Sequence, residues 1–137
     1  MVLNIDLAPT LLDLAGAPIP PRMQGRSWKP VLEGKDPAGR EAWLYEYTWE
    51  KAYPWDPTQF GVRTRRYKYI RYPDLGNTDP DYPMKGELPY DELYDLESDP
   101  MEMRNLAQDP AAASLLARMR DLLKKLLAET GYPGGYR

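Results

Sequence analysis

The segment from Asp109 to Gly131 constrains the fold of this chain more than any other. Asp109 can cap a helix that begins at Pro110, and Gly131 suits its end. Charged residues lie mainly opposite an apolar face, and a helix with one apolar face has to bury it against another element. That face is centred on Leu115, Met119, Leu122, Leu123 and Leu126 and is widened by Leu116 and Leu127.

The middle of the chain changes to a period of two, which is typical of strands. In the first alternating run, Trp43, Tyr45 and Tyr47 share one face. Prolines place residues 49–58 and 73–90 in loops. The pattern predicts strands at residues 41–48, 59–64, 67–72 and 90–96, with a hairpin turn at 65–66.

The N-terminal part has helical rather than strand spacing. Residues 4–16 predict a helix with Pro9 in its first turn and Gly16 in the left-handed position after its last turn. A short helical piece capped by Ser27 is expected to follow and to end at Gly34. The apolar stripe of the first helix consists of Leu7, Leu11, Leu14 and Ala15, widened by Leu12.

Composition excludes several classes of protein. The 137 residues suffice for one domain, and a net charge of −3 provides no field that attracts nucleic acid or anionic lipid. No apolar run approaches the roughly 20 residues that cross a bilayer, and no signal-peptide pattern opens the chain. We therefore expect a soluble domain whose compartment stays open. The chain has no Cys and no His, which excludes thiolate metal sites and the commonest general base.

Four segments resemble those of sulfatases, the arylsulfatase-like enzymes of the alkaline-phosphatase superfamily. Residues 92–106 (ELYDLESDPMEMRNL) are similar to a segment near the sulfatase C-terminus. Residues 6–16, 24–30 and 62–70 resemble three further sulfatase segments, and all four occur in the family's order. The resemblance covers nearly the whole chain and indicates the C-terminal portion of a sulfatase.

The resemblance implies an α+β fold. It predicts an antiparallel sheet of about four strands packed against the long C-terminal helix, preceded by an N-terminal helix left over from a large α/β domain. Residues 1–36 would be the remnant of that large domain, and residues 37–137 would be the sulfatase C-terminal subdomain.

Sulfatase catalysis, as the resemblance implies, uses a formylglycine made from Cys or Ser, a calcium ion, and His and Lys residues. No Cys or His is present, and Ser27, Ser98 and Ser114 lack the Pro and Arg of the formylglycine motif. We therefore expect no catalytic residue, metal ligand or cofactor in this chain, although the intact protein would cleave sulfate esters or sulfamates. The alternatives are a stand-alone carbohydrate- or protein-binding module and an inactive accessory subunit.

Basic residues alternate with aromatic ones across the predicted hairpin, from residue 63 to residue 71. Paired or solvated charges on a two-sided strand would explain this pattern. Arg63 and Lys68 are also candidates for holding a sulfated or carboxylated substrate. Binding of single-stranded nucleic acid is disfavoured by the net acidity.

Three aromatic residues, Trp49, Tyr53 and Trp55, fall within seven residues of a predicted loop. They are candidates for stacking on a sugar, and their alternative role is to pack the loop onto the sheet. The acidic residues of 91–102 suggest calcium, but the spacing of an EF-hand is absent, and turn formation at Asp99 is the alternative.

The first helix would lack a partner without the large domain, because its leucine stripe needs a surface to cover it. We expect it to dock onto a sulfatase core or to drive self-association. A sulfated carbohydrate is the other expected partner, whereas neither nucleic acid nor a membrane is expected.

Overall fold

The computed structural model describes all residues except 36–38, 85–86, 88 and 132–137. The chain divides into two compact units, Met1–Glu41 and Ala42–Arg137. The predicted domain boundary between residues 36 and 37 lies outside the described residues and stays a prediction. In the described part of the chain, no helix is both long and apolar enough to cross a membrane.

The first unit contains a 3-10 turn η1 (Asn4–Asp6), helix α1 (Leu7–Leu14) and the short helix α2 (Lys29–Leu32). The predicted N-terminal helix is therefore confirmed, and Gly16 has the expected positive φ of 70°. The N-cap of α2 is Trp28 rather than the predicted Ser27, but the Ser27 hydroxyl accepts a hydrogen bond from the Lys29 amide at 3.1 Å.

Asp6 organises this unit from a buried position, with only 2% of its surface exposed. Its carboxylate accepts hydrogen bonds from the amides of Leu3 and Arg26, both at 2.8 Å, and pairs with Arg40 at 2.6 Å. Burial raises the pKa of Asp6, but the bonds from the Arg26 and Leu3 amides and the charge of Arg40 outweigh it and leave the pKa lowered. A Cβ on Gly25 would lie 2.0 Å from a backbone oxygen, so only glycine fits beside Asp6.

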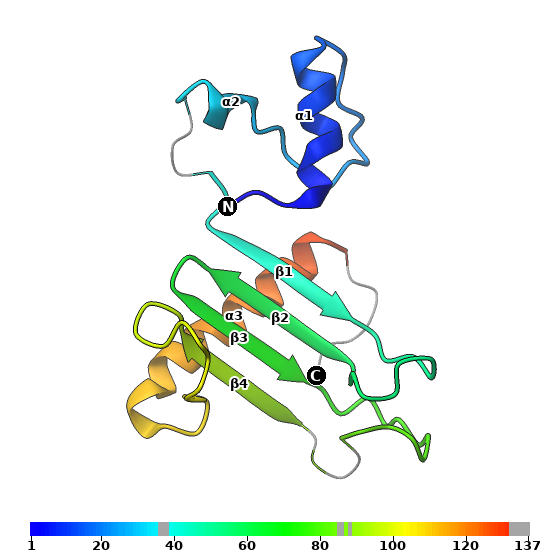
Figure 1. The fold of residues 1–137 in the computed structure, drawn as a ribbon, viewed down its shortest axis with the longest axis vertical. Coiled ribbons are helices and arrows are strands. Elements are labelled where there is room, and N and C mark those ends of the chain that lie inside the picture. The colour runs from blue at the N-terminus through cyan, green and yellow to red at the C-terminus, as the bar shows by residue number, and fades with distance from the viewer. Residues whose placement is uncertain (36–38, 85–86, 88, 132–137) are drawn as a thin grey trace. The chain divides into compact units, whose positions relative to one another are not determined.

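The second unit is built on a four-stranded antiparallel sheet (Figure 1). Its strand order is β1-β2-β3-β4, so each strand pairs with its neighbours in sequence. All four predicted strands are confirmed, and the hairpin turns at Arg65 and Arg66 as expected. The strands are β1 (Ala42–Tyr47), β2 (Gln59–Thr64), β3 (Tyr67–Tyr72) and β4 (Tyr90–Asp95).

The C-terminal helix crosses one face of this sheet (Figure 1). A 3-10 turn η2 (Pro110–Ala112) leads into α3 (Ala113–Glu129), and the Asp109 carboxylate accepts the Ala111 amide at 2.9 Å. The α+β architecture predicted from the sequence is thus confirmed. The core between the two layers consists of Phe60, Val62, Tyr69, Leu93, Leu116, Met119, Leu123 and Leu127.

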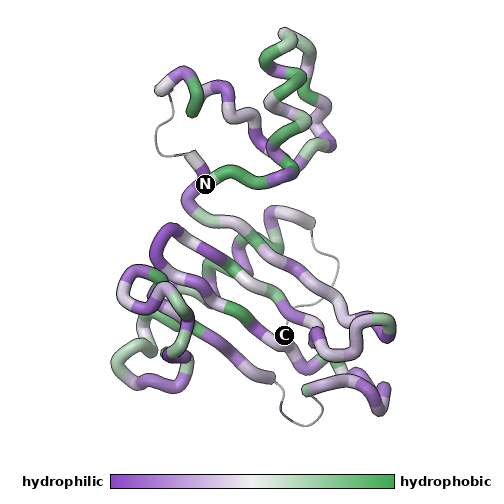
Figure 2. Tube along the Cα trace, in the orientation of Figure 1, coloured by the Kyte–Doolittle hydropathy of each residue, from purple (hydrophilic) through white to green (hydrophobic). Residues whose placement is uncertain are grey.

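The helix is rotated slightly from the predicted orientation. Leu116 and Leu127, expected at the margin of the apolar face, lie in the core, whereas Leu115, Leu122 and Leu126 are half-buried at its edge. Helical spacing identified the apolar residues, but seven of them form a face too broad to show which row meets the sheet. Figure 2 shows short hydrophobic stretches interrupted by hydrophilic residues along the strands.

One buried carboxylate, that of Asp91, connects the sheet to the helix. Asp91 accepts a hydrogen bond from the Tyr69 hydroxyl at 2.9 Å and pairs with Arg71 at 3.1 Å. It also forms an ion pair with Arg120 of α3. Because Asp91 is only 6% exposed, these three partners stabilise a charge that would otherwise be costly to bury.

Residues 96–106, which we call the clasp, follow β4 and fold back against it. The Asn105 side chain accepts the Leu93 amide at 3.0 Å and donates to the Asp91 carbonyl at 3.1 Å. The Leu106 amide then donates to the Leu93 carbonyl at 2.8 Å. Asp99 accepts the Arg104 amide at 2.8 Å, so the turn-forming role considered for Asp99 is present.

Replacing Asp91 should destabilise the second unit strongly. Asp91→Ala leaves Arg71 and Arg120 without their shared partner, and removal of one member of a buried ion pair typically costs about 3–5 kcal/mol of unfolding free energy. Urea denaturation measures the change. Arg104→Ala, which breaks only the exposed pair with Asp109, should change stability by less than about 1 kcal/mol, and equal effects of the two variants would contradict the role of Asp91.

Acid should weaken the fold through Asp95. Hydrogen bonding from Arg66 lowers the pKa of Asp95 to about 2. Because an unfolded Asp has a pKa of about 3.9, stabilisation by Asp95 is complete above that pH and is lost as pH falls towards about 2. In urea midpoints measured between pH 5 and pH 2, Asp95→Asn should show a shallower decline than the wild type. Parallel curves would refute this.

Candidate functional site

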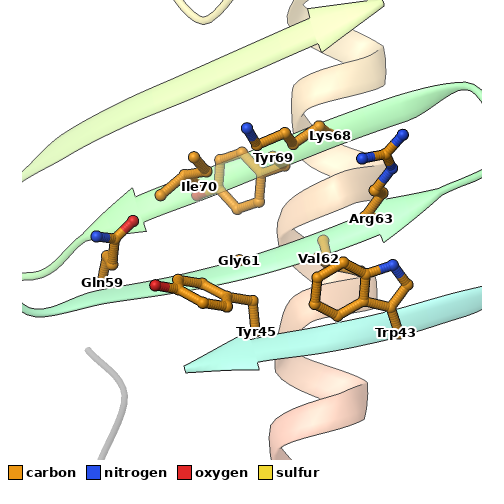
Figure 3. A pocket seen from close by; sticks show the side chains of 9 residues that line it. All are labelled: Trp43, Tyr45, Gln59, Gly61, Val62, Arg63, Lys68, Tyr69 and Ile70. Carbon is orange, nitrogen blue, oxygen red and sulfur yellow. The ribbon is translucent and has the colours of Figure 1, made fainter. Parts of the chain in front are cut away.

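The sheet face opposite α3 carries a pocket with a volume of about 300 Å³ (Figure 3). Strands β1, β2 and β3 all contribute to it. Its lining consists of Trp43, Tyr45, Gln59, Gly61, Val62, Arg63, Lys68, Tyr69 and Ile70.

Gly61 produces the hollow. It lies in the middle of β2, directly across from Tyr45 of β1 and Ile70 of β3. A Cβ on Gly61 would lie 3.3 Å from the Tyr69 carbonyl oxygen, 3.6 Å from the Tyr45 Cβ and 3.7 Å from an Ile70 side-chain carbon. The missing side chain therefore leaves a depression between Tyr45 and Ile70, as glycines in strands often do.

Aromatic rings form one wall of the pocket. Trp43 and Tyr45 project from β1 and meet edge to face, with ring centroids 6.5 Å apart and planes at 88°. Trp43 is half-buried, while Tyr45 is 40% exposed. Figure 3 shows both rings beside Gly61, with Gln59 and Arg63 placed further along β2 in opposite directions.

The two basic residues of the pocket differ in their charge environment. Lys68 forms an ion pair with Glu102, and its ammonium group lies 6.0 Å from the centre of the Tyr94 ring. Arg63 is exposed and forms no ion pair with any described residue. Arg63 therefore supplies the uncompensated positive charge of the pocket.

An area with two tyrosine hydroxyls around the Glu92 carboxylate continues from the pocket towards β4. Glu92 accepts hydrogen bonds from the hydroxyls of Tyr72 at 3.4 Å and Tyr94 at 3.1 Å. Burial and the nearby Glu92 charge raise the pKa of Tyr94 to about 12, and they raise the pKa of Tyr72 as well. Both hydroxyls thus stay protonated at neutral pH.

Of the predicted binding residues, Arg63 and Lys68 are brought together at this pocket. The alternative interpretation of the hairpin charges applies to two of its other arginines. Arg66 makes a two-pronged contact with Asp95, at 3.0 and 2.7 Å, and Arg71 pairs with Asp91. Arg66 lies in the turn before β3 and Arg71 lies in β3, and both contact aspartates of β4.

The predicted aromatic trio lies elsewhere and does not line the pocket. Trp49 packs edge to face on buried Tyr82 at 5.6 Å, and its indole N–H donates to the Pro54 carbonyl at 3.3 Å. Trp49 therefore packs its loop against the loop that follows β3, and not onto the sheet as was considered for it. Tyr53 and Trp55 are 61% and 85% exposed on the same loop, so their side chains are open to a ligand.

Sequence reasoning missed Trp43, Tyr45, Gln59 and Ile70 as pocket residues. The alternation in β1 already placed Trp43 and Tyr45 on one face, and Gly61 inside a strand signalled a gap. What the sequence lacked was the register that sets Gly61 between Tyr45 and Ile70.

Metal binding finds no support in the described part of the chain, which holds no group of three or more acidic residues placed around a common point. The acidic residues near the clasp are engaged with protein partners instead. Asp91 and Asp95 pair with arginines, and Glu102 pairs with Lys68. The serines and carboxylates here thus do not fit the formylglycine and calcium of sulfatases.

The family model described as "N-sulphoglucosamine sulphohydrolase, C-terminal" matches residues 1–129. Two curated relatives come from Bacteroides thetaiotaomicron. An N-acetylglucosamine-6-O-sulfatase is 36% identical over 93% of this chain and 21% of its own length. A delta 4,5-hexuronate-2-O-sulfatase is 39% identical over 88% of this chain and 22% of its own length.

Solved structures of other proteins are also similar to this chain. A protein solved in complex with its substrate D-glucosamine-2-N,6-O-disulfate superposes with a TM-score of 0.76 and 31% identity, covering 92% of this chain and 24% of that one. The phosphonate monoester hydrolase of Agrobacterium radiobacter gives a TM-score of 0.65 and 25% identity, covering 91% and 24%. The chain spans about a fifth to a quarter of the length of these proteins.

Motif order, the sheet-and-helix fold and a family match over almost all residues lead to one assignment. The chain belongs to the sulfatases, as a C-terminal domain of the N-sulphoglucosamine sulphohydrolase type.

Proposed function

We propose that this chain acts as the C-terminal subdomain of a carbohydrate sulfatase, supplying structure and part of the substrate rim. Its curated relatives are named for sulfatase activity on N-acetylglucosamine and hexuronate units, which supports a sulfated carbohydrate as substrate. The nucleophile and calcium site would be supplied by a catalytic region equivalent to the part of those relatives that this chain does not match.

The observation that carries this proposal is the apolar surface of α1. Leu7, Leu11 and Leu14 are 51%, 59% and 56% exposed, although they recur at helical spacing. The opposite side of the same helix is well packed, with Pro9 and Thr10 buried. A continuous apolar stripe on an otherwise ordered helix marks an interface, and a sulfatase catalytic region is its proposed partner.

The loop of residues 49–58 supports the rim role. Trp49 anchors it to Tyr82, and the buried Thr58 hydroxyl accepts the Trp49 amide at 2.9 Å. Tyr53 and Trp55 therefore stand on a braced loop with their rings exposed, as ring stacking on sugars requires. The same observation favours a stand-alone carbohydrate-binding module as the second candidate.

The purified chain should not hydrolyse an aryl sulfate. Neither a Cys nor a serine in the formylglycine context is present to attack the sulfur. Release of 4-nitrophenol from 4-nitrophenyl sulfate measures this directly, with calcium present. Turnover above the uncatalysed rate that survives repeated purification would refute the proposed division of labour.

Substitution of Leu11 should disrupt docking. We expect the chain to bind the catalytic segment of the Bacteroides N-acetylglucosamine-6-O-sulfatase, expressed without the part matched here. Leu11→Glu places a charge in the apolar stripe and should weaken this complex at least about tenfold, because burying an unpaired carboxylate is costly. Size-exclusion chromatography with light scattering detects the complex.

Met103→Glu is the matched control, because Met103 is also an exposed apolar residue, at 83%, but lies in the clasp. It should bind like the wild type. If the wild-type chain forms a dimer that Leu11→Glu dissolves, and binds no catalytic segment, the stripe serves self-association instead.

A further inference from the structure

We propose that the pocket on the outer sheet face binds one sulfated sugar unit, with the sugar ring against Trp43 and Tyr45 and the sulfate on Arg63. The inference rests on the proposed function, because it takes a sulfated carbohydrate as the ligand class. It assigns that ligand to a pocket that lies apart from the exposed aromatic loop.

The charge of the pocket favours a ligand with one negative charge. Lys68 is neutralised by Glu102, whereas Arg63 forms no ion pair with the residues that the structure describes. The pocket therefore carries one available positive charge, which matches the single negative charge of a sulfate ester. A guanidinium group donates two parallel hydrogen bonds to such an oxyanion, which an ammonium group cannot do.

The size of the pocket favours a ligand of one sugar unit. A volume of about 300 Å³ lies at the lower end of the range for small-ligand pockets, roughly 300–1,000 Å³. Gln59 and Arg63 are four residues apart on β2, so their Cα atoms lie about 13 Å from each other at about 3.3 Å per residue. This length accommodates a sugar ring together with its sulfate group.

The remaining lining residues suit a sugar ring better than a second anion. The Trp43 and Tyr45 rings form an aromatic wall against which the C–H face of a pyranose can pack. The half-exposed Gln59 amide offers both a donor and an acceptor for ring hydroxyls. Gly61 leaves the floor open, and Ile70 closes the side opposite Tyr45.

Titration of the 137-residue chain tests the site. Glucosamine 6-sulfate is added while amide and indole resonances are followed by NMR, with glucosamine and inorganic sulfate as comparison ligands. We expect saturable shifts at Trp43, Tyr45 and Gly61. Glucosamine 6-sulfate should bind at least about tenfold more tightly than either comparison ligand, because only it engages both the aromatic wall and Arg63.

Two variants localise the binding. Arg63→Gln removes the charge and should weaken binding at least about tenfold, and Gly61→Ala raises the floor by a methyl group and should also weaken it. Arg118→Gln is the matched control, since Arg118 is exposed on α3, lines no part of the pocket and forms no ion pair with the described residues. It should bind like the wild type. Amide spectra confirm that each variant is folded.

Three results would overturn the proposal. Equal weakening by Arg63→Gln and Arg118→Gln would show unspecific attraction of anions. Equal affinity for inorganic sulfate would show an anion site without sugar recognition. Absence of shifts at the pocket would show that this face does not bind the sulfated sugar. Docking through Leu11 is measured separately without sugar, so failure of the pocket is distinguishable from failure of the proposed function.

Discussion

The second unit depends on the charge cluster around Asp91. Apolar contacts hold α3 against the sheet, but hydrophobic attraction has no direction and would tolerate sliding of the helix. Asp91 restricts this freedom because its carboxylate must meet Arg71 and the Tyr69 hydroxyl from the sheet and Arg120 from the helix at once. A single buried group thus fixes the alignment of two layers whose apolar faces alone would leave it open.

The segment that resembles sulfatases most strongly, residues 92–106, is explained by the same region. Asn105 and Leu106 bond the backbone of β4, and Glu102 reaches Lys68 on β3. The Asn105 and Glu102 side chains are specific because each closes a hydrogen bond or ion pair, whereas Leu106 bonds through its backbone amide. The motif therefore indicates family membership through a structural role, since none of these contacts requires a bound substrate.

Signals within a few residues predicted the helices and strands, whereas contacts between residues far apart in the sequence form the pocket. Pro110 and Asp109 marked the start of the last helix, and Arg65 and Arg66 marked the hairpin turn, because these signals act within a few residues. The contact of Asp91 with Arg120 joins residues 29 apart and leaves no local trace. The pocket was equally hidden, because Tyr45 and Gly61 become neighbours only through the register of β1 on β2. Arg63 and Lys68 lie side by side because they are register partners in one hairpin.

Gly61 leaves a hollow in the outer sheet face, and the backbone beside it limits what can fill that hollow. The hollow exists because one side chain is missing from a strand that is hydrogen-bonded on both sides. An added Cβ would lie 3.3 Å from the Tyr69 carbonyl oxygen of the adjacent strand, which is tighter than most contacts of this kind. A side chain at this position would therefore press on the backbone of β3, so the depth of the hollow is tied to the spacing of β2 and β3. Recognition at this surface can diverge between related chains more readily at Tyr45, Gln59 and Arg63, whose side chains are exposed or half-exposed, than at Gly61.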